Sequence, residues 1–274
     1  MTNFLFHKFL LSCVLILSII ESEAMTSDSA KKVLVVGATG ATGKHVVQML
    51  LDKGQTVHVI ARSKDTMLSL LKEKDYGDNL SVTEASFLDL TEEQLQEKTK
   101  DCQAVVSCLG HTLDFSGLFG HPRRLVTDAA KRLTTAMPDG SRFILMGSDG
   151  VSHPDGTTDK VRSHPERMLL FLLRSLLPPH ADNEAAALYM HQHRDLDWVV
   201  VRPTDLIDDD VSKYSLFAAP TGSLFGSGMV ATRANVADFM VNLIVNEEKW
   251  GKYKHQMPVL NDDPTPPLKE TEEL

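Results

Sequence analysis

Cysteine is scarce in this chain of 274 residues, and its scarcity excludes two classes of small domain. Three cysteines are present: Cys13 lies near the amino terminus, and Cys102 and Cys108 lie in the middle of the chain. A disulfide framework needs an even set of cysteines, and a structural zinc site needs paired ligands at short, regular spacing. Neither pattern occurs, so we interpret Cys102 and Cys108 as ordinary buried thiols.

Basic residues are also fewer than acidic ones in this chain. Lys and Arg number 28 against 37 Asp and Glu, which gives a formal net charge of -9 at pH 7. Surfaces that bind nucleic acids depend on clustered Lys and Arg, so this balance argues against a nucleic-acid partner. A hydrophobic content of 42% and a charged content of 24% are typical of a globular protein with a core of its own.

The apolar run near the amino terminus lacks the length of a comfortable membrane span. A His-Lys pair precedes this uncharged run at residues 9–20, and Ser22 and Ala24 follow at the offsets of a cleavage site. The layout predicts a secretory signal peptide. Two alternatives stay open, an uncleaved signal anchor and a start of translation at Met25 that would give a cytoplasmic protein. All three place residues 1–30, the leader, outside the fold.

Beyond the leader, short apolar runs alternate with segments of helical periodicity. The predicted strands are residues 32–36, 56–60, 81–87, 104–108, 142–146 and 198–202. The predicted helices are residues 42–53, 64–74, 92–99, 122–136, 181–193 and 235–246. Strands rich in Val and Ile without polar alternation are buried on both faces, and their alternation with helices predicts an α/β fold with a doubly wound, mostly parallel sheet.

This pattern predicts one domain over residues 31–262. Two segments, residues 150–180 and 204–233, are too long for simple connections, and we expect them to form a small lobe on the substrate side. The acidic, proline-rich tail at 263–274 is expected to be disordered.

Three glycines stand between the first predicted strand and the first helix, in VVGATGATGKHV. Gly37 permits a tight turn, Gly40 lets a diphosphate approach the backbone, and Gly43 lets the helix pack close to the strand. The helix start offers free N–H groups and the positive end of the helix dipole. A merely tight turn would not need three glycines, so the motif predicts a dinucleotide cofactor. Its phosphates would be held by Gly37, Thr39, Gly40, Ala41, Thr42 and Gly43.

The end of the second strand indicates which dinucleotide is bound. An NAD(H) site places a carboxylate there, whereas this chain has Arg62 and Ser63, and its next carboxylate is Asp65. A guanidinium can bind a 2′-phosphate with two hydrogen bonds and lie against the adenine ring. We therefore predict NADP(H) over NAD(H), with Arg62 and Ser63 on the 2′-phosphate. The alternative is a solvated arginine at a helix start.

These features resemble the short-chain dehydrogenase/reductase superfamily in its atypical branch, which includes NmrA-like proteins and flavin-type biliverdin reductases. The resemblance covers about residues 32–260 and is more specific for fold and cofactor than for reaction. The matching motifs are GATGATG at 37–43, DL at 89–90, SCLG at 107–110, MGS at 146–148, DWVVVRP at 197–203 and RANVAD at 233–238.

The resemblance implies an NAD(P)-binding Rossmann fold and roles for further residues. Asp89 and Leu90 would contact the adenine, and Leu109 and Gly110 would lie beside the cofactor riboses. Ser148 matches the active-site serine of the family. Pro203, at the Arg-Pro end of the sixth strand, would lie near the nicotinamide.

One family motif is missing from the chain. Standard members use Tyr-x-x-x-Lys, in which the lysine lowers the tyrosine pKa for proton transfer, and none of the four tyrosines here has that spacing. In the resemblance, the tyrosine position falls at Pro179 and the lysine position at Asn183. An amide cannot act as an acid but can hydrogen-bond a ribose or a carboxamide. Alcohol dehydrogenation by that pair is therefore excluded.

Flavin-type biliverdin reductases also lack the pair, so the resemblance implies hydride transfer to a small conjugated acceptor such as a quinone, flavin or tetrapyrrole. Ser148 and Asn183 would act at the nicotinamide end. The alternative is a non-catalytic redox sensor or scaffold that binds the cofactor, as NmrA-like relatives do. An epimerase is disfavoured, because such relatives usually keep the tyrosine and lysine.

Several other patterns have an ordinary interpretation beside a functional one. His180 could donate a proton or simply cap a helix. The apolar run at residues 168–177 fits core or lid packing, or else a membrane or dimer face. Asp208, Asp209 and Asp210 read as a solvated loop, and the two-residue spacing of His191 and His193 does not suit a metal pair. We predict no metal, a small-molecule substrate and membrane contact only through an uncleaved leader, with the oligomeric state open.

Overall fold

The computed structural model describes residues 32–263, apart from 72–73, 112–113, 115–116, 119, 157–160, 222 and 226–227. The predicted leader and nearly all of the predicted tail lie outside these residues. Among the residues described, none of the helices combines the length and the apolar character that crossing a bilayer demands.

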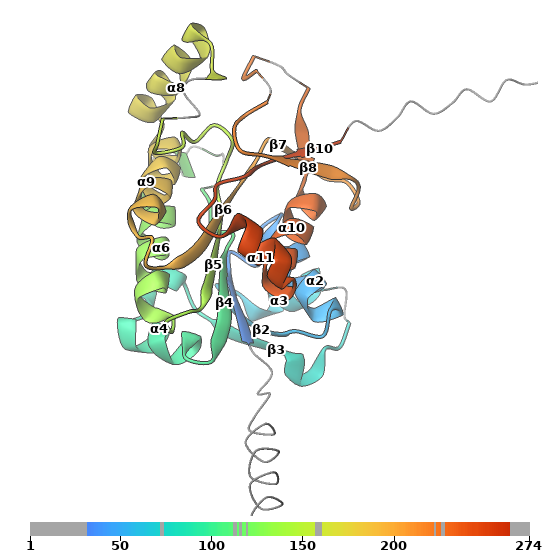
Figure 1. The fold of residues 1–274 in the computed structure, drawn as a ribbon. Helices are drawn as coiled ribbons and strands as arrows, with labels where there is room; N and C mark the ends of the chain where they lie inside the picture. Colours follow the sequence, from blue (N-terminus) through green and yellow to red (C-terminus); the bar gives the residue numbers. More distant parts are fainter. Residues whose placement is uncertain are drawn as a thin grey trace, which may run out of the picture. The chain divides into compact units, whose positions relative to one another are not determined.

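The described residues contain an eight-stranded sheet with the order β3-β2-β1-β4-β5-β6-β10-β8 (Figure 1). The strands are β1 (Lys32–Val36), β2 (Thr56–Ala61), β3 (Leu80–Glu84), β4 (Cys102–Ser107), β5 (Arg142–Met146), β6 (Asp197–Pro203), β8 (Tyr214–Phe217) and β10 (Val259–Asp262). All pairings in it are parallel except that of β8 with β10. The predicted doubly wound α/β fold is confirmed. The strand order reverses between β1 and β4, and this is where ligands bind in such folds.

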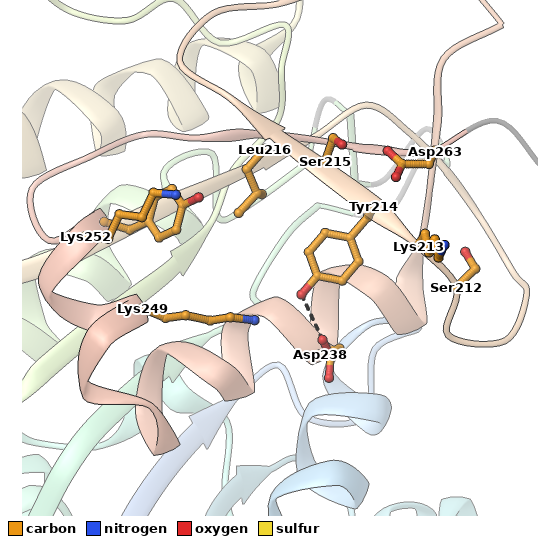
Figure 2. Close-up of a pocket in the computed structure, with 10 residues that line it drawn as sticks. Ser212, Lys213, Tyr214, Ser215, Leu216, Asp238, Lys249, Lys252 and Asp263 are labelled. Atoms are coloured by element: carbon orange, nitrogen blue, oxygen red, sulfur yellow. Dashed lines mark hydrogen bonds between the residues drawn. The ribbon is translucent and has the colours of Figure 1, made fainter.

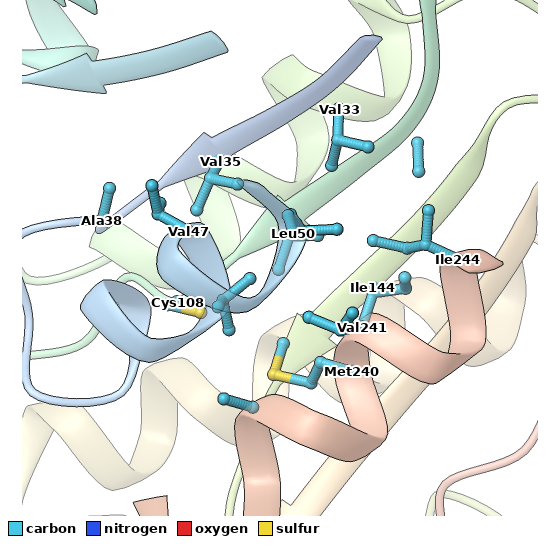
Figure 3. Close-up of a cluster of buried hydrophobic side chains, with 14 of the residues drawn as sticks. Val33, Val35, Ala38, Val47, Leu50, Cys108, Ile144, Met240, Val241 and Ile244 are labelled. Atoms are coloured by element: carbon cyan, nitrogen blue, oxygen red, sulfur yellow. The ribbon is translucent and has the colours of Figure 1, made fainter. Parts of the chain in front are cut away.

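Helices cover both faces of the sheet (Figure 1). They are α2 (Gly43–Asp52), α3 (Lys64–Leu70), α4 (Glu92–Thr99), α6 (Leu125–Ala136), α8 (His164–Leu176), α9 (Pro178–Gln192), α10 (Arg233–Val245) and α11 (Glu247–Tyr253). The packing of strand β1 explains why its sequence is apolar throughout. Val33 and Val35 pack on the side of α2 and α10 (Figure 3), and Leu34 and Val36 pack on the side of α6 and α9.

Several predicted boundaries were wrong. The third strand was expected at 81–87, but β3 ends at Glu84 and Phe87–Asp89 forms a 3-10 turn that buries the Phe87 ring. The helix expected at 64–74 ends at Leu70. The one expected from residue 122 begins at Leu125, because the Asp182 carboxylate accepts the amides of its first turn. The helix expected from residue 181 begins at Pro178, where a proline suits the first turn.

The segments at 150–180 and 204–233 also hold elements that were not predicted. The first contains α8, whose capping box pairs Ser163 with Glu166. The second contains β8 and a two-stranded parallel sheet of β7 (Asp205–Ile207) and β9 (Val230–Thr232). Each of these strands has three or four residues, too few to produce a readable sequence period.

Candidate functional site

The glycine-rich turn after β1 lies directly against the end of β4. Gly37 has a φ of +73°, and a Cβ built there would lie 2.5 Å from the carbonyl carbon and oxygen of Cys108. A Cβ on Gly43 would lie 2.2 Å from the Gly37 carbonyl oxygen, so α2 packs on the turn itself. A Cβ on Gly40 would contact, among the described residues, the Gly37 oxygen alone, at 3.1 Å, and the space beyond it is open. Bare backbone is thus required at Gly37 and Gly43.

The start of α2 carries unused hydrogen-bond donors. The Gly40 amide donates to the Gly37 carbonyl at 3.0 Å, which closes the turn. Within the described part of the chain, the amides of Thr39 and Ala41 make no hydrogen bond, and the Thr42 side chain does not cap the helix. The first turn of α2 also has no acidic residue. Free amides and an uncompensated helix dipole together suit an anion such as a diphosphate.

The end of β4 completes this cradle. The Cys108 amide donates to the Val36 carbonyl at 2.9 Å, which fixes the β4 end beside the turn. Leu109 packs against the core on the α6 side, and Gly110 is exposed. The Ser107 hydroxyl is fully buried, and its oxygen has no hydrogen-bond partner in the described residues. The orphaned hydroxyl and the bare cradle fit a dinucleotide that brings polar groups to this edge of the sheet.

Arg62 and Ser63 lie at the carboxyl end of β2, as predicted from the sequence. Arg62 is exposed. Ser63 caps α3, where its hydroxyl oxygen accepts from the Thr66 amide at 3.1 Å and from the Thr66 hydroxyl at 3.0 Å, so its own proton stays available to donate. Glu84, which the sequence reasoning missed, lies opposite Ala61 in the register and accepts from the Lys64 amide at 3.0 Å. A carboxylate therefore lies close to the expected phosphate position.

Asp89 and Leu90 follow β3 and differ in exposure. Asp89 is exposed, whereas the Leu90 side chain is buried in the core on the α6 side. Arg132 on α6 fixes the segment, because its guanidinium donates to the carbonyl of Leu88 at 3.2 Å and to that of Leu90. Leu90 thus has a packing role in the structure, and Asp89 presents its carboxylate to solvent.

Ser148 lies in the loop after β5, which is held on β6. The Gly147 amide donates to the Val201 carbonyl at 2.7 Å, and the Asp149 amide donates to the Pro203 carbonyl at 3.0 Å. Pro203 itself is buried at the end of β6. The Ser148 hydroxyl accepts from the Gly150 amide at 3.3 Å.

His180, at the start of α9, lies beside the same glycine. A Cβ on Gly150 would lie 3.5 Å from His180 Cε1 and 3.7 Å from Ser148 Oγ. Ser148 and His180 therefore both approach Gly150, a residue that has no side chain.

Glu184 lies one turn further along α9 than His180 and contacts it. Its Oε1 lies 3.6 Å from His180 Nε2 and accepts from the Arg174 Nε at 2.7 Å and the Ser152 amide at 3.1 Å. Burial raises the pKa of the Glu184 carboxyl, but the contact with His180 and the hydrogen bonds from Ser152 and Arg174 outweigh it, so its net pKa is lowered. Glu184 is therefore held ionised beside the imidazole.

Asn183 and Asp182, the neighbours of Glu184, make other contacts. The Asn183 amide nitrogen donates back to the Pro179 carbonyl at 3.1 Å, within its own helix. Asp182, which the sequence reasoning missed, is buried and accepts from the Val126 amide at 2.8 Å and from His111 Nε2 at 2.9 Å. Its carboxylate thus stabilises the start of α6.

Arg202 braces the substrate side of the sheet. This fully buried guanidinium donates to the carbonyls of Met257 at 2.7 Å, Val151 at 3.2 Å and Ala218 at 3.1 Å. Burial lowers its pKa to about 10, against the opposing effect of Asp149 and Asp155. Arg202 therefore joins the loops after β5 and β8 to the segment before β10.

The tyrosine hydroxyls that the structure describes as hydrogen-bonded have partners away from Ser148. Tyr76 donates to Asp52 at 3.0 Å, Tyr189 contacts Thr134 at 3.0 Å, and Tyr214 donates to Asp238 at 2.8 Å. Across the described residues, no group of three or more His, Cys, Asp or Glu side chains could hold a metal ion. The three aspartates at 208–210 are exposed, and Asp208 pairs with Arg233 at 3.0 Å.

Comparison with known proteins agrees with this geometry. The model of the NAD(P)H-binding family matches residues 37–247, most of the chain. A comparison with curated protein sequences gives no match.

Solved structures share the fold at low sequence identity. A crystal structure of a protein from Lactobacillus casei is 17% identical with a TM-score of 0.66, over 85% of this chain and 100% of that one. The anaerobillin reductase ChuY from Escherichia coli O157:H7 is 18% identical with a TM-score of 0.57, over 87% of this chain and 100% of that one. A short-chain dehydrogenase/reductase from Veillonella parvula, solved in complex with NADP, is 15% identical with a TM-score of 0.60. The match covers 85% of this chain and 95% of that one.

The family match covers the glycine turn, the β4 end and the Ser148 loop in one continuous stretch. It confirms, at the level of family and fold, the resemblance drawn from the sequence. The chain is therefore a member of the NAD(P)H-binding family.

Proposed function

We propose that the protein binds NADP(H) and reduces a small conjugated acceptor, a quinone, flavin or tetrapyrrole, by hydride transfer without a Tyr-Lys pair. The observation that carries this proposal is the bare glycine cradle, with its free amides, at the same carboxyl edge of the sheet as the polar pair Ser148 and His180. A neighbour named as an anaerobillin reductase and another named as a short-chain dehydrogenase/reductase support a reductase as the class.

The choice of NADP(H) over NAD(H) rests on the end of β2. The exposed Arg62 can turn onto a 2′-phosphate, and the Ser63 hydroxyl keeps a proton for it. Glu84 opposes this choice, because its carboxylate repels the phosphate. The guanidinium outweighs it in our proposal, since Arg62 can make two charge-assisted hydrogen bonds while Glu84 is tied to the Lys64 amide.

At the other end of the cofactor, reduced nicotinamide supplies the hydride when it is bound. Ser148 orients the carboxamide or the acceptor through its hydroxyl. Asn183 offers its amide to the same end after it leaves the Pro179 carbonyl. His180, next to the ionised Glu184, donates the proton that a reduced acceptor takes up.

Turnover of purified protein with NADPH and a panel of quinones, flavins and tetrapyrroles tests the proposal. We expect loss of the reduced-nicotinamide absorbance with at least one acceptor, and a rate about tenfold or more lower in Ser148→Ala. Ser175→Ala, on the exposed side of α8, is the matched control and should keep the full rate.

The second candidate is a non-catalytic redox sensor or scaffold whose cofactor stabilises a partner-binding surface. Helix α8 favours it, because Met168, Phe171 and Leu176 are 65%, 63% and 66% exposed on one helix. Tight NADPH binding with no oxidation by any acceptor in the panel would support this candidate and contradict the reductase.

A further inference from the structure

A pocket of about 680 Å³ lies between β8, α10 and α11 (Figure 2). The volume lies in the range of small-ligand sites, and the hollow is largely open to solvent. None of its lining residues belongs to the glycine turn at 37–43 or to the group formed by Ser148, His180 and Glu184. The lining consists of Ser212, Lys213, Tyr214, Ser215, Leu216, Asp238, Lys249, Lys252, Tyr253 and Asp263.

The aromatic wall of this pocket is fixed before any ligand arrives. The rings of Tyr214 and Tyr253 both pack edge-on against Phe239, with centroids at 6.4 Å and 5.2 Å. The Tyr214 hydroxyl donates to Asp238 at 2.8 Å, and Asp238 also accepts from the Asn242 amide at 2.8 Å. Burial, followed by the Asp238 contact, raises the pKa of Tyr214, which therefore stays protonated. A preformed wall spares a ligand the entropy cost of ordering it.

The rim of the pocket is cationic. Lys249 and Lys252 are three apart on α11 and so share one face, and Lys213 comes from the loop before β8. Figure 2 shows Lys249 extended along the pocket with its ammonium group toward Tyr214 and Asp238. Within the described residues none of these three lysines forms an ion pair, whereas the neighbouring Lys254 pairs with Asp197.

The two carboxylates of the pocket, Asp238 and Asp263, offset part of this charge, and the three lysines leave one positive charge in excess. Asp238 is already engaged by Tyr214 and Asn242, and Asp263 lies beside Lys213 at the other end of the pocket (Figure 2). In a chain of net charge -9, three lysines around one hollow form a local attraction for anions.

We propose that this pocket is a second binding site, for a planar aromatic molecule that carries a phosphate, sulfonate or carboxylate. The ring lies against Tyr214 and Tyr253, and the anionic group lies between Lys249 and Lys252. The site is separate from the coenzyme cradle and does not depend on the proposed reductase activity.

Titration calorimetry with 1-naphthyl phosphate, in the presence of saturating NADP⁺, tests the proposal. We expect binding that Lys249→Gln weakens about tenfold and Lys252→Gln weakens several-fold, since each removes one charge-assisted contact. Lys53→Gln, the same change at an exposed lysine outside the pocket, should bind like the unaltered protein. Neutral 1-naphthol and inorganic phosphate, which each lack one half of the ligand, should bind at least tenfold more weakly.

Three results with the aromatic ester, and one with inorganic phosphate, would overturn the proposal. The three are no heat with 1-naphthyl phosphate, binding that appears only when NADP⁺ is omitted, and binding that both pocket lysine variants retain in full. Inorganic phosphate that binds as tightly as the aromatic ester would equally contradict it. The far-ultraviolet circular dichroism of each variant shows that the comparison is made on folded protein.

Discussion

Replacing Gly37 by alanine tests the feature on which the coenzyme cradle depends, the contact of bare backbone with the end of β4. Gly54 provides a matched control, because its φ is also +73° and a Cβ there would meet nothing within 4 Å. An alanine with this φ costs about 1 kcal/mol at either position. At Gly37 the Cβ must also displace the Cys108 carbonyl, 2.5 Å away, and such overpacking adds about 1–3 kcal/mol.

Thermal unfolding separates these two costs. For a domain of this size 1 kcal/mol shifts Tm by about 2–4 °C, so we expect Gly54→Ala to lower Tm by about that much. Gly37→Ala, at about 3 kcal/mol in total, should lower it by about 6–12 °C. Calorimetry with NADPH, run well below either Tm, should find weakened binding in Gly37→Ala and unchanged binding in Gly54→Ala.

The two alanines must therefore differ in both measurements. Equal Tm shifts would mean that the turn moves away from β4 without cost. Full NADPH affinity in Gly37→Ala would mean that the turn does not hold the diphosphate, and the reasoning about the cradle would be refuted.

Three further predictions concern the coenzyme choice, acid sensitivity and the brace under the substrate lobe. Arg62→Ala should reduce the preference for NADPH over NADH about tenfold, and Glu84→Gln should increase it, as measured by the ratio of the two dissociation constants. Burial lowers the pKa of His58 from 6.5 to about 4. Between these two pH values the unfolded chain therefore binds a proton at His58 that the folded chain does not bind. The free energy of unfolding should consequently fall as the pH drops from about 6.5 to about 4. Urea unfolding at a series of pH values measures this fall, and His58→Gln should make it smaller. Arg202→Met should lower the free energy of unfolding by about 3 kcal/mol, because the buried carbonyls of Met257 and Val151 and the partly exposed carbonyl of Ala218 lose their donor. A loss within about 0.5 kcal/mol, the level of a surface change, would contradict the bracing role.

The sequence predicted the sheet well where strands are buried on both faces. All six predicted strands occur, because runs such as Val33 to Val36 must be apolar on both sides when helices cover both faces. The sequence did not predict strands β10 and β8, which extend the sheet beyond β6. Their pairing depends on contacts between segments far apart in the chain, such as Asn261 with Ser215, and four residues carry too little periodicity to reveal it.

The candidate site was predictable to a similar extent. The glycine turn is a local motif, so spacing alone indicated where Gly37, Gly40 and Gly43 would lie. Glu84 and Asp182 were missed because their roles depend on neighbours across the fold, the Lys64 amide for one and the start of α6 for the other. Arg202 was recognised as part of a motif, but its burial against three carbonyls from three segments follows from packing that no local pattern records.

The missing Tyr-Lys pair has a specific consequence on α9. The two positions that the resemblance assigns to that pair, Pro179 and Asn183, contact each other here, since the Asn183 amide donates to the Pro179 carbonyl. Neither group carries a proton that it can release at neutral pH. The side chain of this helix end that approaches the same glycine as Ser148 is His180, and Glu184 holds a negative charge 3.6 Å from its Nε2. If the protein reduces its acceptor as proposed, the acid has moved by one residue along the helix. His180→Gln should then slow acceptors that must gain a proton with the hydride more than those that leave as anions.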